Sequence, residues 1–294
     1  MAEITINTLS GNVEKIYGKS LHPIHSFIED NALKDTDDEA ILRRLFVVKK
    51  SRNWAESNVG LTGLGRFGLY EELGIGKRDS QEETYQKVIE HYDYSLGTSI
   101  SHKVMREAKM SSLATPKDRY LQIVNSYSST KLEFAVAALT GGDAGLGSAT
   151  FAFENKTDYD RTTGDGQALF SKDHVIKKTD KKQSNIFSDA LDSNGVLLDY
   201  LVNVGRNLKN DSGRETGFLF DTIIIPGNRP GLERLVKTLI GSNRIIGSPN
   251  NDMNAQEGLF NIMVLNKWIA NADTGILMSS KANTYLNGSI FFDR

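Results

Sequence analysis

The chain has 294 residues, 39% hydrophobic and 24% charged, the composition of an ordinary globular protein with one large core or two linked cores. It contains no cysteine, which excludes disulfides, thiolate zinc sites and a cysteine nucleophile and is compatible with assembly in a reducing cytoplasm. A net charge of −2 argues against a dedicated DNA reader, and we expect neither a signal peptide nor a membrane-spanning helix, since no suitable apolar run occurs in the sequence.

The first 50 residues predict an extended arm with short helices. Weak helical patterns cover Val13–Tyr17 and Asp38–Val48, and they are interrupted at Pro23 and by the acidic run Asp35–Glu39. A glycine-rich segment follows from Trp54 to Lys77. It is too long for a tight turn and too aromatic for a linker, so we expect a projecting loop.

Side chains that are mostly apolar at every second position predict a long, half-buried strand from Val88 to Ile100. At about 3.3 Å per residue it would span roughly 40 Å, which is well beyond an ordinary strand. Paired with the segment before the glycine-rich loop, it would form a hairpin that reaches beyond its own domain. We therefore expect the backbone of Trp54–Tyr92 to have few partners within its own fold.

The strongest helix signal begins at Thr115, a good cap, and continues with Pro116 at the first helical position and Asp118 near the positive end of the dipole. The glycine pair Gly141–Gly142 ends it, which gives a spine helix of about 25 residues, roughly 37 Å long. Its predicted apolar face consists of Leu121, Val124, Ser128, Leu132, Ala135 and Leu139.

The second half of the chain predicts an α/β lobe. An amphipathic helix over Ser193–Lys209 precedes a β-α-β unit made of Phe218–Ile225, Pro230–Ile240 and Leu259–Leu265. The helix is expected to bury Val196, Leu197, Tyr200, Leu201, Val204 and Leu208. Two further strand candidates, Gly275–Met278 and Gly288–Phe292, close the chain. The fold class is therefore α+β.

The mid-chain run Gly166–Asn185 contains a compact Phe-Ser-x-x-His turn that ends in Ser-Asn, with no catalytic partner to explain it. It resembles a loop of the major capsid proteins of tailed bacteriophages, among which the major head subunits of Mu-like phages and prophages are most similar. The residues that carry this resemblance, called here the signature residues, are Phe170, Ser171, His174, Ser184 and Asn185. The order of elements is similar to the Hong Kong 97 fold.

The resemblance implies the organisation of the chain. Residues 1–50 would be the N-terminal arm, 53–92 the extended loop, 93–141 the peripheral domain with the spine helix, 142–275 the axial domain, and 276–294 the C-terminal strands that return to the body. Relatives often carry a cleavable scaffolding segment ahead of the arm. Because this sequence starts at the arm, we expect a separate scaffold protein.

The resemblance also implies a function. Many copies would assemble as hexamers and pentamers into an icosahedral virion shell around double-stranded DNA, in the cytoplasm of a bacterial host, with portal and head-completion proteins as further partners. No reaction, catalytic residue, cofactor, metal or membrane contact is expected. Intersubunit contacts are expected from the extended-loop residues Trp54, Arg66, Phe67, Tyr70, Glu71 and Glu72, and from Tyr92 and Tyr94.

Several motifs allow other interpretations. Gly63–Gly68 matches GxGxxG, but no apolar strand precedes it, and Ser128–Lys131 matches SxxK inside the spine helix without a KTG triplet. The oxygen-bearing group Asn250, Asn251, Asp252 and Asn254 could ligate a cation, yet it lacks the calcium-loop pattern and favours a turn. The histidines His22, His25, His91, His102 and His174 lack metal-binding spacing, and for His174 we expect a ring nitrogen bonded to loop backbone or to Ser171.

Two small basic groups favour solvated faces, with a lumen-facing or intersubunit contact as the alternative. They are Lys49, Lys50 and Arg52, and then Lys177, Lys178, Lys181 and Lys182. Two other functions remain open at this point. One is an encapsulin-type compartment shell, and the other is an α/β enzyme with an anion site at Pro226-Gly227-Asn228 ahead of a helix.

Overall fold

The computed structural model describes residues 37–61, 83–97, 116–244, 253–254, 256–270, 272–285 and 288–293. Helices and strands are both present, so the predicted α+β class is confirmed. The chain divides into two compact units. Unit 1 comprises the residues up to Trp54, Glu90–Ala135 and the residues from Ser289 onward, and unit 2 comprises Ala55–Ile89 and Val136–Gly288.

Unit 1 joins the two ends of the described chain in a small parallel sheet. Helix α2 (Asp37–Leu45) carries acidic residues in its first turn and Arg43 and Arg44 in its last, in accord with the helix dipole. Strand β1 (Val47–Lys50) follows and pairs in parallel with β11 (Ile290–Asp293). The helical prediction for Asp38–Val48 therefore extends too far, because its last residues form β1.

Helix α4 (Pro116–Thr140) has the predicted bounds and ends where Gly141 adopts φ 82°. A Cβ at Gly141 would lie 2.0 Å from the Gly145 carbonyl oxygen, so no other residue fits this turn. Except for Leu121, whose side chain lies outside the described set, the predicted apolar face is buried: Val124, Ser128, Leu132, Ala135 and Leu139. The prediction of the spine helix is confirmed.

The long strand predicted over Val88–Ile100 is wrong in its bounds. Strand β3 (Glu83–Glu90) covers only the first three residues of this range, residues 91–97 form no strand, and residues 98–100 lie outside the described residues. At the start of this stretch the His91 N–H donates to the Trp54 carbonyl at 3.3 Å. Beyond this bond no described strand pairs with residues 92–97, because β2 (Ala55–Leu61), the partner of β3, begins only after Trp54.

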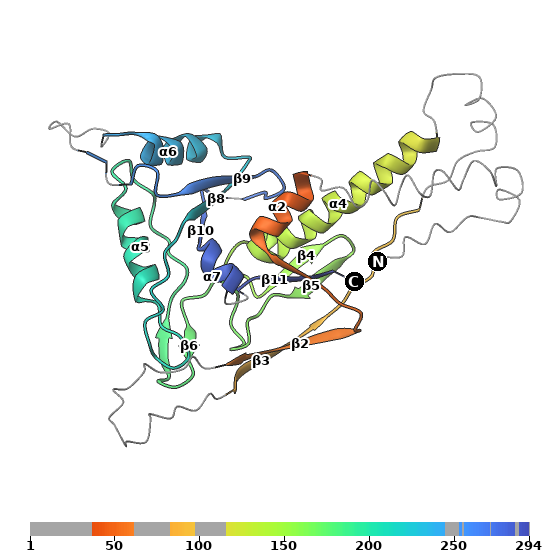
Figure 1. Ribbon diagram of the computed structural model, residues 1–294, viewed down its shortest axis with the longest axis horizontal. Helices are drawn as coiled ribbons and strands as arrows, with labels where there is room; N and C mark the ends of the chain where they lie inside the picture. Colours follow the sequence, from red (N-terminus) through yellow and green to blue (C-terminus); the bar gives the residue numbers. More distant parts are fainter. Residues whose placement is uncertain are drawn as a thin grey trace, which may run out of the picture. The chain divides into compact units, whose positions relative to one another are not determined.

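Unit 2 contains a three-stranded mixed sheet of order β10-β8-β9 (Figure 1). Strands β8 (Thr222–Pro226) and β9 (Asn261–Leu265) are parallel and in register from Thr222↔Asn261 to Pro226↔Leu265, and helix α6 (Pro230–Gly241) connects them. Strand β10 (Ile276–Met278) pairs antiparallel with β8. The predicted β-α-β unit is confirmed.

The predicted buried face of helix α5 (Val196–Asn207) is only partly correct, because four of its residues are half-buried: Leu197, Leu201, Val204 and Leu208. Leu198 and Gly205 are buried, whereas Val196 and Tyr200 are 64% and 51% exposed. Gly205 is in the buried face because its missing side chain admits Phe220, whose ring would lie 2.3 Å from an added Cβ. The core of this region comprises Leu198, Ile223, Ile225, Val236, Ile240 and Phe260, from α5, β8, α6 and the residue before β9.

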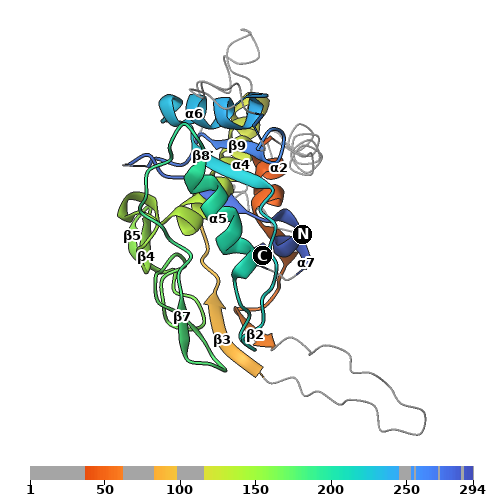
Figure 2. The ribbon, with the colours of Figure 1, turned by 90° about the vertical axis from the view of Figure 1, so that its left-hand side faces the viewer.

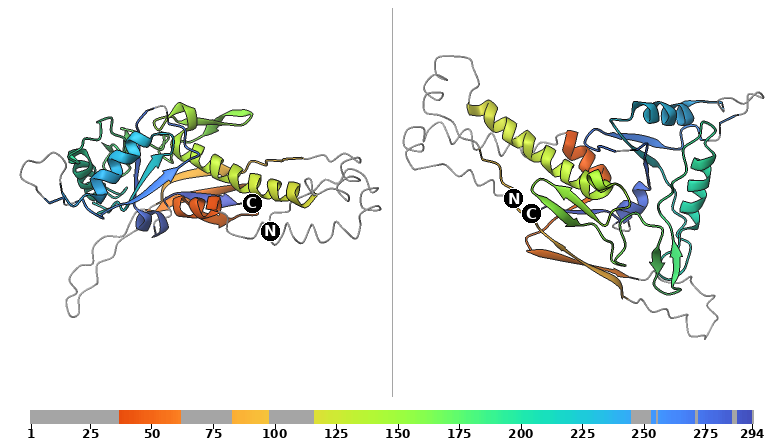
Figure 3. Two further views of the ribbon diagram at one scale, coloured as in Figure 1. Left: turned by 90° about the horizontal axis from the view of Figure 1, so that it is seen from above. Right: turned by 180° about the vertical axis from the view of Figure 1, so that it is seen from behind.

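Three two-stranded antiparallel sheets complete unit 2. Strands β2 and β3 form one of them and lie side by side in Figure 3. The others are β4 (Thr150–Phe153) with β5 (Lys156–Asp160), and β6 (His174–Ile176) with β7 (Lys181–Gln183). Figure 2 shows the hairpin that contains β7 near β3, and the Tyr85 hydroxyl of β3 bonds to the Val175 carbonyl of β6 in this hairpin. The short elements η1 (Gly142–Ala144) and α7 (Ser280–Tyr285) follow α4 and β10.

Candidate functional site

The signature residues form one interlocked loop in unit 2. The Ser171 N–H donates to the side-chain oxygen of Asn185 at 2.7 Å, and the Asn185 N–H donates back to the Ser171 carbonyl at 3.1 Å. The Asn185 amide also donates to the Leu169 carbonyl at 2.8 Å. The Ser184 hydroxyl donates to the Ile186 carbonyl at 2.8 Å. These bonds hold the two ends of the β6–β7 hairpin together.

The His174 side chain contacts two other residues of the same loop. Its Nδ1 lies 2.8 Å from a carboxylate oxygen of Asp165, and its Nε2 lies 3.3 Å from the Leu169 carbonyl oxygen. Both ring nitrogens thus have local partners, one of them the loop backbone, as expected from the sequence. Burial would raise the pKa of Asp165, but hydrogen bonds from Thr163 and His174 outweigh it and lower that pKa. The sequence does not reveal this partner, because Asp165 and His174 are 9 residues apart in a loop without regular spacing.

Arg161 is the buried charge that connects this loop to α4, and sequence reasoning missed it. The side chain is 6% exposed, and its guanidinium lies 5.6 Å from the ring centre of Phe170. It donates to the carbonyls of Ala138, Leu139, Gly145, Leu146 and Ser148. Burial lowers the pKa of Arg161 to about 10, so the group stays charged at neutral pH. A cation suits the end of a helix, where carbonyl groups lack intrahelical partners.

Strand β3 has several side-chain and backbone partners within unit 2. The Tyr85 hydroxyl donates to the Val175 carbonyl at 3.3 Å, and the Lys177 ammonium donates to the carbonyls of Glu83 and Thr84, each at 2.9 Å. Lys87 forms an ion pair with Asp160. The expectation that this segment has few partners in its own fold is wrong for β3, because basic and aromatic side chains fasten it to β5 and β6.

The predicted intersubunit residues are only partly described. Trp54 is 74% exposed, and Tyr92 and Tyr94 are 41% and 45% exposed. The ring of Tyr94 packs 5.9 Å from that of Phe134 on α4. The other extended-loop residues, Arg66, Phe67, Tyr70, Glu71 and Glu72, lie outside the described residues. Their intersubunit role stays a prediction.

The geometry ahead of α6 does not favour the anion site considered for an enzyme. The Gly227 N–H donates to the Leu265 carbonyl at 3.0 Å and the Arg229 N–H donates to the Pro226 carbonyl at 3.3 Å. A Cβ at Gly227 would lie 2.5 Å from a side-chain oxygen of Asn266, so close packing explains this glycine. Since these two N–H groups already have acceptors, they are not directed at a ligand.

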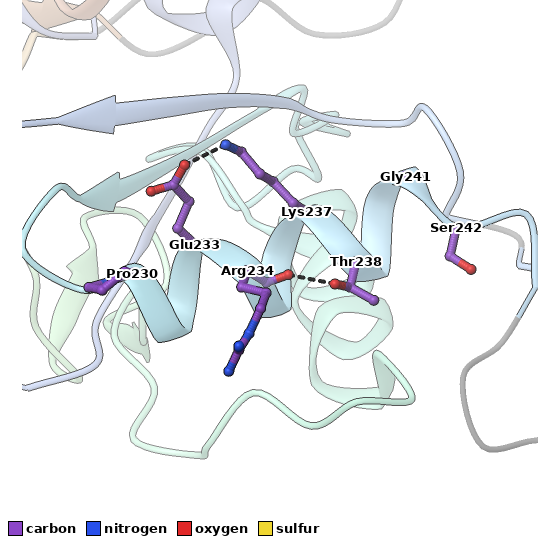
Figure 4. Close-up of a pocket in the computed structure, with 7 residues that line it drawn as sticks. All are labelled: Pro230, Glu233, Arg234, Lys237, Thr238, Gly241 and Ser242. Carbon is purple, nitrogen blue, oxygen red and sulfur yellow. Dashed lines mark hydrogen bonds and ion pairs between the residues drawn. The ribbon is translucent and has the colours of Figure 1, made fainter.

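An open depression of about 520 Å³ lies along α6 (Figure 4). Its lining residues all belong to this helix and the residue after it: Pro230, Glu233, Arg234, Lys237, Thr238, Gly241 and Ser242. The Lys237 ammonium donates to the Glu233 carboxylate, and the Thr238 hydroxyl donates to the Arg234 carbonyl at 2.7 Å. A depression lined by one mixed-charge helix face gives no convergent set of groups for catalysis.

The other motifs have structural partners where they are described. Lys131 of the SxxK match pairs with Asp293 at 2.8 Å, and the Asn254 amide donates to the carbonyls of Leu239 and Ser242 at the end of α6. The GxGxxG match, Asn250–Asp252, His22, His25 and His102 lie outside the described residues. Among the described residues no three His, Cys, Asp or Glu side chains gather as a metal site, and no described helix is long and apolar enough to cross a membrane.

Comparison with known proteins gives similarity at the level of structure only. No protein-family model matches the sequence, and no curated protein matches it significantly. Among solved structures, a chain of the bacteriophage JBD30 capsid aligns with a TM-score of 0.49 at 14% identity, over 80% of this chain and 92% of that one. A chain from the JBD30 capsid decorated with minor capsid protein trimers aligns with a TM-score of 0.48 at 12% identity, over 77% and 90%.

Proposed function

We propose that the chain is a structural subunit of a phage-type capsid with a Hong Kong 97-like fold and that it catalyses no reaction. The observation that carries this proposal is the succession of elements. An antiparallel strand pair, β2–β3, precedes the 25-residue helix α4, and a parallel β8-α6-β9 lobe follows. The strand pair, the long helix and the β-α-β lobe thus follow one another in the order that the sequence resemblance implies.

Exposed apolar side chains support a role in association. Trp54 and Leu96 are 74% and 65% exposed. Tyr92 and Tyr94 lie in the same stretch as Leu96, and the bond from the His91 N–H to the Trp54 carbonyl places Trp54 beside the start of this stretch. Large apolar side chains gathered on a surface are favourable sites for burial against a partner. In a shell, each subunit would bury such surface on several neighbours, so weak contacts would add up through multivalency. Contacts repeated around rings fit heterologous interfaces.

The finer parts of the proposal follow from the resemblance. The subunit would belong with the Mu-like head subunits and form hexamers and pentamers around double-stranded DNA in the virion. The domain boundaries would be those at residues 50, 53–92, 141 and 275. A separate scaffold, a portal and head-completion proteins would be the partners, after assembly in the host cytoplasm. A near-neutral subunit suits a container that must release its DNA.

Sedimentation velocity of the purified chain over a wide concentration range tests this proposal. We expect large assemblies, and we expect the double substitution Trp54→Ser with Leu96→Ser to shift the material toward small species. Ile269→Ser is the matched control, because Ile269 is 64% exposed but lies outside this stretch. A chain that stays monomeric at every concentration, with and without its scaffold, would contradict the proposal.

A further inference from the structure

Tyr85 of β3 is held at both ends by a single loop of unit 2. Its hydroxyl donates to the Val175 carbonyl at 3.3 Å. At its other end, the backbone of Gly164 is so close that a Cβ there would lie 2.6 Å from the Tyr85 Cβ. Burial and the carboxylates of Asp211, Asp165 and Asp180 raise the pKa of Tyr85.

Two lysines fasten β3 on either side of Tyr85. Lys177 donates to the carbonyls of Glu83 and Thr84, each at 2.9 Å, and its ammonium lies 5.5 Å from the centre of the Tyr85 ring. Lys87 donates to the Thr162 hydroxyl at 2.7 Å and to the carboxylate of Asp160. On one side of Tyr85, β3 is thus held to the end of β5, and on the other side it is held by the residue that follows β6.

The Asp165–His174 pair brings the two contact points for Tyr85 together. Asp165 follows Gly164 in the chain and His174 precedes Val175, and their side chains meet at 2.8 Å while being only 8% and 15% exposed. The Thr163 hydroxyl also donates to Asp165, and the Thr163 N–H donates to the Gln167 carbonyl at 2.7 Å. A charge-assisted bond at this position fixes the spacing between Gly164 and Val175.

We propose that the loop from Thr162 to Lys177, closed by Asp165 and His174, is a socket that holds β3 through Tyr85 and so sets the direction of the β2–β3 strand pair on its own subunit. This gives the signature residue His174 a positioning role through the loop. The socket is formed within one chain and does not depend on shell formation. If the proposed function is correct, the socket would orient this strand pair before neighbouring subunits meet.

Hydrogen exchange of the purified full chain, followed by mass spectrometry, tests the socket. We expect His174→Ala to speed exchange in a peptide covering Glu83–Glu90 at least tenfold, and to leave a peptide covering β8 within twofold of the parent chain. Lys182→Ala is the matched control. It removes an exposed ion pair, 3.0 Å long, between Lys182 of β7 and Asp173, while leaving the Asp165–His174 pair and Tyr85 intact, and should change neither peptide.

The outcomes separate a socket from general stabilisation. Exchange that rises equally in the β3 and β8 peptides, or no more in β3 than with Lys182→Ala, overturns the proposal. Tyr85→Phe removes only the hydroxyl and should speed β3 exchange about threefold, an effect that should vanish in a His174→Ala background because the socket is already open. Additive effects of the two changes would also overturn it. If His174→Ala does not fold, Gly164→Ala takes its place, and unchanged β3 exchange in that variant overturns the proposal.

Discussion

Replacing Arg161 with Met should destabilise unit 2 more than any single surface change. The substitution keeps a long side chain but removes every donor from a site where five carbonyl groups converge on one guanidinium at 2.5–3.5 Å. Four of these bonds are 2.9 Å or shorter. In the variant, carbonyls at the end of α4 and in the following turn would be buried without a donor.

The expected loss of folding free energy follows from the balance between the hydrogen bonds of the guanidinium and the cost of burying its charge. Hydrogen bonds to a charged group contribute about 1.5–3 kcal/mol each, but burial of the guanidinium offsets much of their sum. Removing one partner of such a buried network costs about 3–5 kcal/mol. For a unit of 150–250 residues this corresponds to a fall in Tm of roughly 6–20 °C. Arg161→Lys should lose about half as much, since an ammonium keeps the charge but cannot reach all five carbonyls.

Thermal and urea unfolding, followed by circular dichroism, measures this effect. Arg206→Met serves as the control, because Arg206 is exposed on α5 and should change stability by less than about 0.5 kcal/mol. A loss below about 1 kcal/mol for Arg161→Met would refute the view that this residue joins α4 to the turn and the signature loop.

Two further predictions concern ion pairs. Hydrogen bonds from Lys87 and Thr162 outweigh the effect of burial and lower the pKa of Asp160, and bonds from Thr163 and His174 do the same for Asp165. Both carboxylates should therefore stabilise the fold fully above their unfolded pKa of about 3.9. This contribution should be lost as the pH falls through their lower folded pKa values. Urea midpoints should drop below about pH 4, and the drop should be smaller in Asp165→Asn; an equal drop in both proteins would contradict this. Lys131→Met should leave the Asp293 carboxylate, 25% exposed, without its ammonium partner and cost about 1–3 kcal/mol, whereas the exposed Lys281→Met should cost almost nothing. Unfolding curves of the two variants that coincide would count against a role for this pair in holding β11.

Local signals in the sequence predicted α4 and the β8-α6-β9 unit because both are encoded by nearby residues. Pro116 and Gly141 mark the ends of α4, and Pro230 marks the start of α6. The face of α5 could not be read in this way. Its buried side depends on Phe220 filling the space above Gly205, a contact that hydrophobic spacing does not contain.

Contacts between residues far apart in the sequence explain most of the other differences between the predicted and the observed structure. Strand β1 takes its partner from β11 at the other end of the chain, so Val47 and Val48 resembled the end of a helix in the sequence. The alternation from Tyr92 to Leu96 suggested a strand, yet these side chains are exposed and no strand faces them among the described residues. Arg161 was missed because its partners are backbone carbonyls, which leave no mark in the sequence.

Electron microscopy of the purified full chain, beside a variant lacking Gly60–Gly76, tests the central claim most directly. The account predicts closed shells of uniform size for the full chain. It also predicts a soluble, folded variant that forms no shells, because α4 and the β8-α6-β9 lobe keep their own core. Thermal unfolding of the variant checks that its body is folded. A full chain that forms no particles with or without its scaffold, or a deletion variant that still closes normal shells, would contradict the account.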